Sequence, residues 1–451
     1  MRASFLFLLL TIFRCSAAEK PNVIVFLIDD LGATDVGCYG SKYYETPQID
    51  RLAAEGMRFR AGYSACTVCS PSRAAMITGK WPARLHLTDW IAGHERPFAK
   101  LAIPDWQKKL PVEERTIAQA LHEQGYVTCA IGKWHLSAGG PAAHGFDVAI
   151  GDNHLGQPAS YLTPYKNPNL PDGPPGEELT ARCTEEAVRF IEGHREKPFF
   201  LYLAHFAVHT PLGGTPESIA YFAERATKIS PQGKPAYAAM IKAVDNSVGR
   251  IRARLAELKL DDNTVIIFTG DNGGLELGKV TDNLGVRAGK GSAYEGGVRV
   301  PFIVYWPGVT KAGTVQEAPV ITNDIPATVA DLAGASLPGD GVSLAPVLRG
   351  GAMVPRALYW HYPHYHPGGA TPYSAIREGD WRLVRFYEDG HEELYNLSKD
   401  PEEKDDQASR ETERRGAMGK KLDAWLAETK AQMPTPNPNA NPAKDRGGKE
   451  K

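Results

Sequence analysis

Four apolar segments alternate with helical patterns along much of the sequence, and this alternation constrains the fold more than any other feature. The segments span residues 23–28, 126–131, 199–204 and 265–268, and each has the composition of a buried strand in a parallel sheet. Helical patterns lie between them, at residues 116–124, 179–192 and 237–258. Strands that alternate with helices predict an α/β layered domain.

The pattern changes from about residue 358 onwards. Short strand-like runs at residues 373–377, 381–386 and 393–397 are separated by Gly-Asp and Asp-Gly turns, which predicts an antiparallel meander. Residues 409–430 form an amphipathic helical pattern. We therefore expect a catalytic domain over residues 19–355 and a smaller α+β domain over residues 356–430. The Pro/Asn-rich and then charged residues 431–451 are predicted to be a disordered tail.

The N-terminus has the organisation of a signal peptide, residues 1–18. Met1-Arg2 is a short basic region, residues 3–13 are apolar, and small residues allow cleavage after Ala18. The apolar run is shorter than the roughly 20 residues that a membrane anchor needs. Phe13-Arg14 makes a lipid anchor on Cys15 the weaker alternative. We expect an exported protein, periplasmic or secreted, without a membrane span. The formal net charge of -2 gives no general attraction to nucleic acid or to anionic membranes.

Five cysteines remain after this cleavage, and export would expose them to oxidising conditions. An odd number leaves at least one unpaired or modified. Cys66 and Cys69 form a C-x-x-C pair with no second pair, which does not match a zinc site. A thioredoxin-like redox motif also fits poorly, because Pro71 lies outside the pair. The five are Cys38, Cys66, Cys69, Cys129 and Cys183.

A polar cluster follows each of the four predicted strands. In open α/β sheets, ligands bind in the crevice beyond the carboxyl ends of the strands. Two of the clusters, Asp29-Asp30 and Asp271-Asn272, offer only oxygen atoms, which suit Ca²⁺ or Mg²⁺ and disfavour zinc. Helix capping is the alternative for either pair alone, but two such pairs favour one shared metal. The other clusters are residues 132–135 and the two histidines His205 and His209.

Residues 69–80, with the sequence CSPSRAAMITGK, form a short helical pattern of their own. Ser70 can cap the helix, Pro71 suits its first turn, and Gly79 can end it. Cys69 would then lie just before a helix N-terminus, where an anion is favoured. Arg73 could point at the same anion. The Cys-x3-Arg spacing is not the Cys-x5-Arg loop of cysteine phosphatases, which disfavours thiolate attack on phosphate esters.

Residues 69–73, CSPSR, with Thr78-Gly79 behind them, match the signature of type I sulfatases. The chain resembles this family over roughly residues 20–430, through further segments in the same order. These are PNVIVFLIDDLG, AIGKWHL, HFAVHTPL, FTGDNGG, GKGSAYEGGVRVP, IREGDWRLV and ELYNLSKDPEE. The resemblance implies an arylsulfatase-like enzyme of the alkaline phosphatase superfamily. It also implies an α/β/α sandwich around a large, mixed, mostly parallel sheet, with a C-terminal antiparallel sheet.

In that family a maturation enzyme oxidises the motif cysteine to Cα-formylglycine. The resemblance implies that formylglycine at position 69 hydrates to a geminal diol, which attacks sulfur and expels the alcohol. The second hydroxyl then releases sulfate as the aldehyde re-forms. One Ca²⁺, with Mg²⁺ less favoured, would be held by Asp29, Asp30, residue 69, Asp271 and Asn272.

The resemblance also assigns roles to basic residues. Arg73 and Lys133 would hold the diol, and His135 would be the base that collapses the sulfated intermediate. His209 and Lys290 would contact sulfate and assist the departing oxygen, with His209 the better proton donor. Asp271 could take the proton from the attacking hydroxyl.

Residues outside these motifs are expected to select the substrate, for which a sulfated carbohydrate is the hypothesis. Aromatic and polar side chains suit stacking on a sugar ring, and packing between the domains is the alternative reading. The candidates are His86, Asp89, Trp90, His94 and the stretch of residues 360–366, WHYPHYH.

Three other functions remain open. A phosphoryl or phosphonate ester hydrolase would share a site for tetrahedral oxyanions, although dedicated phosphatases tend to use Ser or Thr with two metals. A glycan-binding protein with unconverted Cys69 would keep the pocket without the chemistry. A structural secreted protein would leave the convergence of Asp, Lys, His and Arg unexplained.

Overall fold

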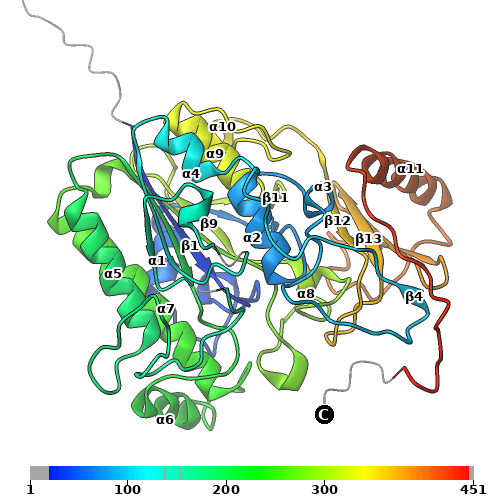
Figure 1. Ribbon diagram of the computed structural model, residues 1–451, viewed down its shortest axis with the longest axis horizontal. Helices are drawn as coiled ribbons and strands as arrows, with labels where there is room; N and C mark the ends of the chain where they lie inside the picture. Colours follow the sequence, from blue (N-terminus) through cyan, green and yellow to red (C-terminus); the bar gives the residue numbers. More distant parts are fainter. Residues whose placement is uncertain (1–19, 137–138, 153, 446–451) are drawn as a thin grey trace, which may run out of the picture.

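The structure is a computed structural model, and it describes residues 20–136, 139–152 and 154–445 (Figure 1). The predicted signal peptide, residues 1–18, lies outside these residues. No helix within the described part of the chain is both long and apolar enough to cross a membrane.

A large sheet forms the centre of the molecule, with eight strands in the order β10-β2-β9-β8-β1-β7-β5-β6. Neighbouring strands are parallel except around β9, which runs antiparallel to both β2 and β8. This confirms the mixed, mostly parallel sheet and places β1 between β7 and β8. The strands are β1 (Asn22–Ile28), β2 (Met57–Phe59), β5 (Val127–Gly132), β6 (Val148–Ile150), β7 (Phe199–His205), β8 (Thr264–Gly270), β9 (Phe302–Tyr305) and β10 (Thr314–Gln316).

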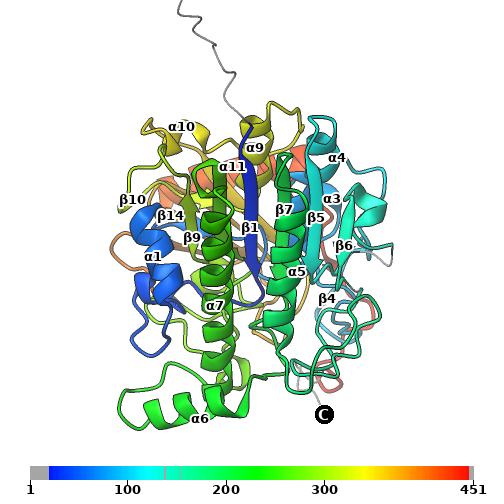
Figure 2. The same ribbon diagram turned by 90° about the vertical axis from the view of Figure 1, so that its left-hand side faces the viewer.

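Helices cover both faces of this sheet because its central strands are apolar on both sides. Along β1, Ile24, Phe26 and Ile28 face one hydrophobic core, and Val23, Val25 and Leu27 face the other. Figure 2 shows α5 and α7 lying across the first face. Helices packing on that face are α1 (Pro47–Glu55), α5 (Leu179–Gly193), α6 (Pro216–Arg225) and α7 (Pro235–Glu257). Those on the other are α2 (Cys69–Thr78), α3 (Pro82–Leu85), α4 (Ile117–His122), α9 (Asp324–Ala333) and α10 (Ala345–Leu348).

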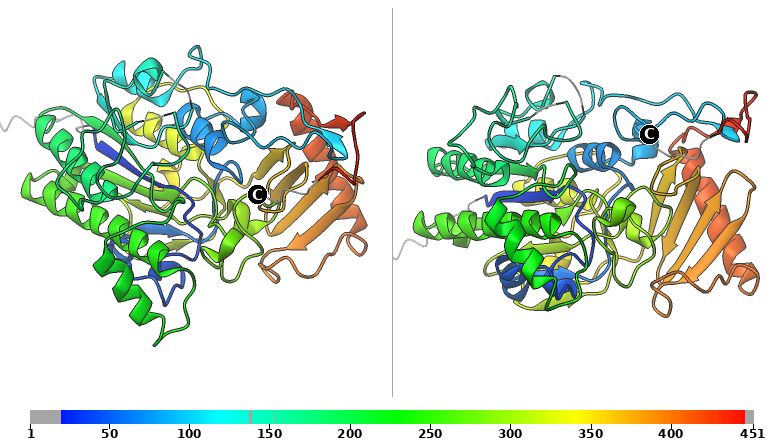
Figure 3. Two further views of the ribbon diagram at one scale, coloured as in Figure 1. Left: turned by 60° about the horizontal axis from the view of Figure 1, so that its bottom comes forward. Right: turned by 90° about the horizontal axis from the view of Figure 1, so that it is seen from below.

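The C-terminal region forms a second, antiparallel sheet in the order β12-β13-β14-β15. Helix α11 (Thr412–Glu428) packs on it through Met418, Leu422 and Trp425 (Figure 3). The predicted meander is therefore confirmed, but the sequence reading missed its first strand, which contains the first three residues of the aromatic and His-rich stretch. The strands are β12 (Ala357–Tyr362), β13 (Tyr373–Glu378), β14 (Trp381–Phe386) and β15 (Glu392–Asn396).

A third hydrophobic core joins the two regions. Tyr63 and Trp81 from the first region pack with Trp360 and Leu383 of the second sheet. The strands that begin near residue 357 thus share a core with earlier residues, next to short helix α8 (Glu295–Val298) and the small pair of β3 (Gly62–Tyr63) with β11 (Val320–Ile321).

Residues 431–445 differ from the predicted disordered tail. β16 (Thr435–Pro436) pairs antiparallel with β4 (Leu101–Ala102). The Asn437 side chain donates hydrogen bonds to the carbonyls of Pro97 and Ala99. The prediction of disorder rested on composition alone. A Pro/Asn-rich segment can still be ordered when it lies extended along a neighbouring loop and donates hydrogen bonds to that loop's carbonyl groups.

Disulfide pairing was left open by the sequence. All five cysteines among the described residues are free thiols, and four of them are buried.

Candidate active site

Residues of all four polar clusters meet at the carboxyl ends of adjacent strands, as the sequence predicts, but His205 instead lies against α7, with its Nε2 3.0 Å from Ser247 Oγ. Asp29-Asp30 follows β1, Asp271-Asn272 follows β8, and Lys133 follows β5. The loop after β7 is bound to β1's end by two backbone hydrogen bonds, Asp29 N–H to Ala207 O and Val208 N–H to Asp29 O, at 3.0 and 2.7 Å. These bonds bring His209 to 3.6 Å from the Asp30 carboxylate.

The acidic residues form one buried group of oxygen atoms. The Asp30 backbone N–H donates to Asp271 Oδ1 at 3.1 Å, and Asn272 Nδ2 donates to Asp30 Oδ1 at 2.8 Å. Asp29 Oδ1 and Asn272 Oδ1 are buried without a hydrogen-bond partner among the described residues. Orphaned buried oxygens of this kind suit a hard divalent cation. Ligand atoms of Asp29, Asp30 and His209 also lie within 4.8 Å of one another, so His209 is a further possible ligand.

Three cations surround this acidic group. Arg73 contacts Asp271 Oδ2 through Nε and Nη2, at 2.9 and 2.8 Å. Lys133 pairs with Asp29, and Lys290 Nζ lies 2.8 Å from Asp30 Oδ1. All of these charged groups are buried or nearly so. Each buried charge needs an opposite charge beside it, because an unpaired charge in the interior would destabilise the folded state.

The neighbouring charges give the two adjacent carboxyls opposite pKa shifts. Burial and the negative charge of Asp271 raise the pKa of Asp29 well above its usual value. Burial also acts to raise the pKa of Asp30, but Lys290, His209 and Lys133 together hold it below its usual value. Asp30 therefore stays ionised, and Asp29 is the carboxyl that most needs a further positive charge.

Cys69 is the first residue of α2 and is almost fully buried. The prediction that Ser70 caps this helix is wrong: Val68 occupies the N-cap position, and the Ser70 hydroxyl accepts a hydrogen bond from Ile91 N–H at 3.1 Å. Cys69 lies in the first turn, at the end where the helix dipole favours negative charge. Gly79 ends the helix in the left-handed conformation, as predicted.

His135 lies beside the candidate nucleophile. Its Nδ1 is 3.3 Å from Cys69 Sγ, while its Nε2 contacts the Ile91 carbonyl oxygen. A carbonyl only accepts, so Nε2 carries the proton and Nδ1 presents a lone pair to residue 69. Burial and then the charge of Lys133 lower the pKa of His135 well below its usual value, so the imidazole is a neutral base.

His209 has the opposite tautomer. Its Nδ1 lies 2.6 Å from the Thr210 carbonyl oxygen and therefore carries the proton, which leaves Nε2 as an acceptor. Burial and the charge of Lys290 lower the pKa of His209 to about 3. His209 must take up a proton before it can donate one from Nε2, so Lys290 is the donor that is ready in this state.

These residues open onto a pocket of about 410 Å³. Of the residues that the sequence singled out for substrate selection, Trp90, His94 and His366 line it. Sequence reasoning missed the rest of the apolar wall, because these residues lie outside the motifs: Ile91, Leu275, Leu277 and Pro367. The lining is Cys69, Trp90, Ile91, His94, His135, Gly156, Gln157, His209, Thr210, Leu275, Leu277, Lys290, His366 and Pro367.

The other substrate candidates do not line this pocket: most of them are buried in the interior, and His86 is only partly buried. Asp89 is buried and accepts a hydrogen bond from Tyr362 O–H at 2.7 Å. Trp360 donates from Nε1 to the Ser64 carbonyl, and His86 contacts the carbonyl of Lys430. For these residues, the alternative reading of packing between the two regions applies.

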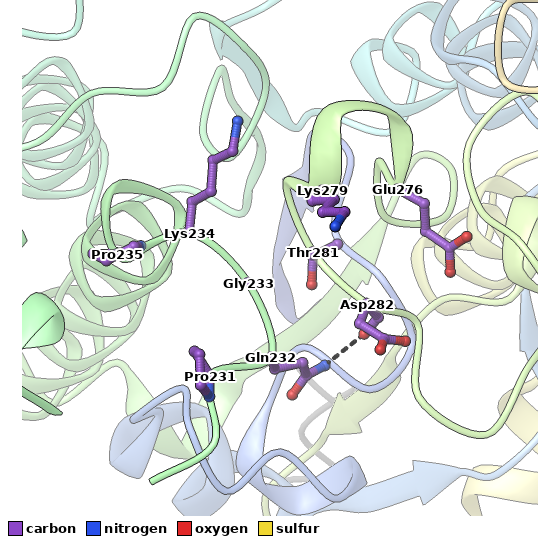
Figure 4. A pocket seen from close by; sticks show the side chains of 9 residues that line it. All are labelled: Pro231, Gln232, Gly233, Lys234, Pro235, Glu276, Lys279, Thr281 and Asp282. Carbon is purple, nitrogen blue, oxygen red and sulfur yellow. Dashed lines mark hydrogen bonds between the residues drawn. The ribbon is translucent and has the colours of Figure 1, made fainter. Parts of the chain in front are cut away.

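A second hollow, of about 680 Å³, shares the loop after β8 with the first (Figure 4). Leu275 and Leu277 face the first pocket, whereas Glu276, Lys279 and Asp282 line the second. Figure 4 shows the Gln232 side-chain amide donating a hydrogen bond to the Asp282 carbonyl oxygen. This bond joins the two segments that line the second hollow, residues 231–235 and 276–282. The residues that line the second hollow include none from the four polar clusters.

Comparisons with known proteins match nearly the whole chain. A family model described as Sulfatase matches residues 21–335, and one described as N-sulphoglucosamine sulphohydrolase, C-terminal, matches residues 289–432. Human arylsulfatase A is 32% identical, over 86% of this chain and 83% of its own length. Dog N-acetylgalactosamine-6-sulfatase is 34% identical, over 76% of this chain and 69% of its own length.

Solved structures agree with these matches. The crystal structure of Ps i-CgsB in complex with k-i-k-neocarrahexaose has a TM-score of 0.75 and 31% identity, and it covers 90% of this chain and 93% of that one. The phosphonate monoester hydrolase of Agrobacterium radiobacter, at 21% identity and a TM-score of 0.69, covers 91% of this chain and 96% of that one, and it shares the fold alone.

Proposed function

The chain belongs to the sulfatase family and is a sulfuric ester hydrolase, and we propose that it removes sulfate from a carbohydrate with a formylglycine made from Cys69 and one Ca²⁺. Its fold is the alkaline-phosphatase-like α/β sandwich that the resemblance implies. The observation that carries the proposal is the meeting of three cations and an all-oxygen acidic group at the carboxyl ends of the central strands, beside a pocket that Cys69, two neutral imidazoles and Lys290 line.

Asp29, Asp30, Asp271 and Asn272 would hold the Ca²⁺ together with residue 69. The two orphaned oxygens, on Asp29 and Asn272, support this assignment. Among the described site residues, Cys69 is the one sulfur-containing side chain, and oxygen ligands are those that Ca²⁺ prefers. When bound, the ion would neutralise the carboxylates and polarise the sulfate ester.

Residue 69 would be the nucleophile. As formylglycine it would supply a hydrated aldehyde, which offers one hydroxyl to attack sulfur and a second to release sulfate. Arg73 and Lys133 would orient this residue and offset its developing negative charge. His135 Nδ1, already 3.3 Å from Cys69 Sγ, would accept the proton that is lost when sulfate leaves.

Lys290 and His209 would bind the sulfate group. Lys290 would donate to a sulfate oxygen from the position where it now pairs with Asp30. An anion beside His209 would raise the pKa of that imidazole, because a nearby opposite charge favours the protonated form. Substrate binding would thereby prepare His209 to protonate the leaving oxygen.

The outer part of the pocket suits a sugar ring. Trp90, Leu275 and Leu277 offer apolar surface. His366 Nδ1 accepts a hydrogen bond from Gly368 N–H at 2.9 Å, so its Nε2 carries the proton and can donate a hydrogen bond to a sugar hydroxyl. Lys290 is the one formally charged residue among the described lining residues, which favours an uncharged ring behind the sulfate.

The proposed route to the active form includes export and maturation. The sequence of residues 1–18 supports cleavage near Ala18 and a periplasmic or secreted location. A formylglycine-generating enzyme is the implied partner, because the CSPSR sequence is the motif that such an enzyme reads.

Matched sulfate and phosphate esters of one phenol, followed by a panel of sulfated monosaccharides, test this function. We expect a higher kcat/KM for the sulfate ester and hydrolysis of at least one singly sulfated neutral sugar. A higher kcat/KM for the phosphate ester would contradict the reaction. Activity restricted to sugars with further anionic groups would contradict the substrate class.

A further inference from the structure

The last residues of the described chain lie across a loop that forms part of the active-site pocket. We call residues 433–445 the strap and residues 89–101 the Trp90 loop. Figure 1 shows the strap, in red, beside β4 at the end of this loop. Backbone bonds continue beyond β16, from Asn437 N–H to Lys100 O at 3.2 Å and from Asn441 N–H to Phe98 O at 3.0 Å.

Side chains reinforce this backbone pairing at two places. Asn437 Nδ2 donates to Pro97 O at 3.0 Å and to Ala99 O at 2.7 Å. Arg96 forms a two-pronged ion pair with Asp445, at 3.0 and 2.5 Å, and both side chains are only about one-fifth exposed. A bidentate, largely buried pair fixes geometry better than an exposed single contact does.

The Trp90 loop has little internal structure of its own. The short strand β4 is its one regular element. Within the loop, Asp89 accepts from the backbone N–H groups of Trp90 and His94, and Ala99 N–H donates to Arg96 O. A segment with so few internal bonds depends on outside contacts for its order.

The same loop reaches the catalytic group at its other end. Ile91 O accepts the hydrogen bond from His135 Nε2, and Ile91 N–H donates to Ser70 in the first turn of α2. Trp90 and His94 form part of the pocket wall. The loop therefore touches the candidate base, the nucleophile helix and the space for the sugar.

We propose that the strap is a positioning element of the sulfatase reaction. By holding residues 96–101, it keeps the Ile91 carbonyl on His135 and keeps Trp90 and His94 in the pocket wall. Asn437 and Asp445 are the positioning residues, and they act through the loop rather than on the substrate. This inference rests on the proposed function for the role of His135.

The test compares Asn437→Ala, Asp445→Asn and their double variant with the unaltered chain, using protein matured to the same formylglycine content. Asp405→Asn is the matched control, because it removes an exposed Arg410–Asp405 ion pair of the C-terminal region, away from the loop. Turnover is measured with a small aryl sulfate and with the best sulfated sugar.

We expect the double variant to lose about 10- to 100-fold in kcat/KM, since small displacements of a reacting group cost this much. The loss should lie in kcat for the aryl sulfate, which needs His135 but little of the wall. With the sugar, KM should rise as well. The control should match the unaltered chain, and Asp445→Glu should recover most of the activity that Asp445→Asn loses.

A chain ending at Met433 gives a stronger version of the same experiment. If it fails to fold, the point variants still decide the matter, because each removes a single contact and should leave the thermal midpoint within a few degrees of that of the unaltered chain. Folded point variants with unchanged kcat and KM on both substrates would overturn the strap proposal. An unaltered chain that hydrolyses no sulfate ester would instead overturn the proposed function.

Discussion

At the scale of single residues, hydrogen-bond partners decide what each polar group can do. The two imidazoles of the site look alike in sequence, yet Ile91 O fixes the proton of His135 on Nε2 while Thr210 O fixes that of His209 on Nδ1. One ring therefore offers a lone pair to residue 69, and the other must gain a proton before it can donate. Motif order could predict both histidines, but the tautomer of His135 depends on the Ile91 carbonyl, which only the fold brings close, and that of His209 depends on the local backbone conformation at Thr210.

Asp89 gives a prediction about pH. Burial raises the pKa of Asp89 to about 7. Hydrogen bonds from Tyr362, Trp90 and His94 act in the opposite direction but do not outweigh burial. The folded state thus binds a proton more tightly than the unfolded chain does. The stability that this proton gives is fully present below about pH 4 and is lost as the pH rises to about 7.

Asp89→Asn should therefore reduce the decline in stability between pH 4 and pH 7, because the amide carries no titrating proton. Thermal midpoints at several pH values in this range check it. If the two proteins lose stability equally over that range, Asp89 is not the group responsible.

At the scale of elements, strand ends place the chemistry. Buried, apolar sequence predicted the central strands and the polar residues behind them, since both signals are local. Strand order, β12 and the strap could not be predicted in this way. β12 reads as an irregular aromatic stretch until its pairing with β13 makes alternate residues point inward, and the strap gains its order from a loop more than 300 residues earlier in the chain.

Gly132, at the end of β5, tests this placement directly. It has φ 94°, and a Cβ there would lie 2.1 Å from the Ala204 carbonyl oxygen. Gly132→Ala should lower stability by more than the roughly 1 kcal/mol typical of a strained left-handed residue. Activity should fall too, because Lys133 and His135 follow at once.

Gly125→Ala is the matched control for this substitution. Gly125 has φ 81° but open space around its Cβ position. It should show the backbone strain alone, with sulfatase activity retained. Urea denaturation and turnover measure both variants, and equal losses would mean that the contact with Ala204 has no special effect.

At the scale of the whole molecule, oppositely charged groups are buried together at the edge of the central sheet. Three carboxylates, two lysines and one arginine meet there, and two of the oxygens have no hydrogen-bond partner among the described residues. An ion bound at this point would link the ends of β1 and β8 and so stabilise the folded chain as a whole. The sequence could indicate the oxygen ligands, but it could not show that Lys133 and Lys290 pair with two of them.

Metal removal should therefore destabilise the protein as well as inactivate it. We expect a Ca²⁺ chelator to lower the thermal midpoint and abolish turnover, and added Ca²⁺ to restore both, because a ligand bound only to the folded state stabilises it by mass action. Asp29→Asn should weaken the response to Ca²⁺. A thermal midpoint and turnover that ignore both chelator and Ca²⁺ would contradict the metal assignment.

The central claim is that residue 69 reacts as formylglycine rather than as a thiol. Peptide mass spectrometry of the segment containing Cys69 measures this most directly, on protein from its native host, with sulfate-ester turnover determined on the same samples. The account predicts an aldehyde in place of the thiol and a turnover proportional to the converted fraction. Sulfate-ester hydrolysis by protein whose Cys69 is entirely unmodified would contradict it.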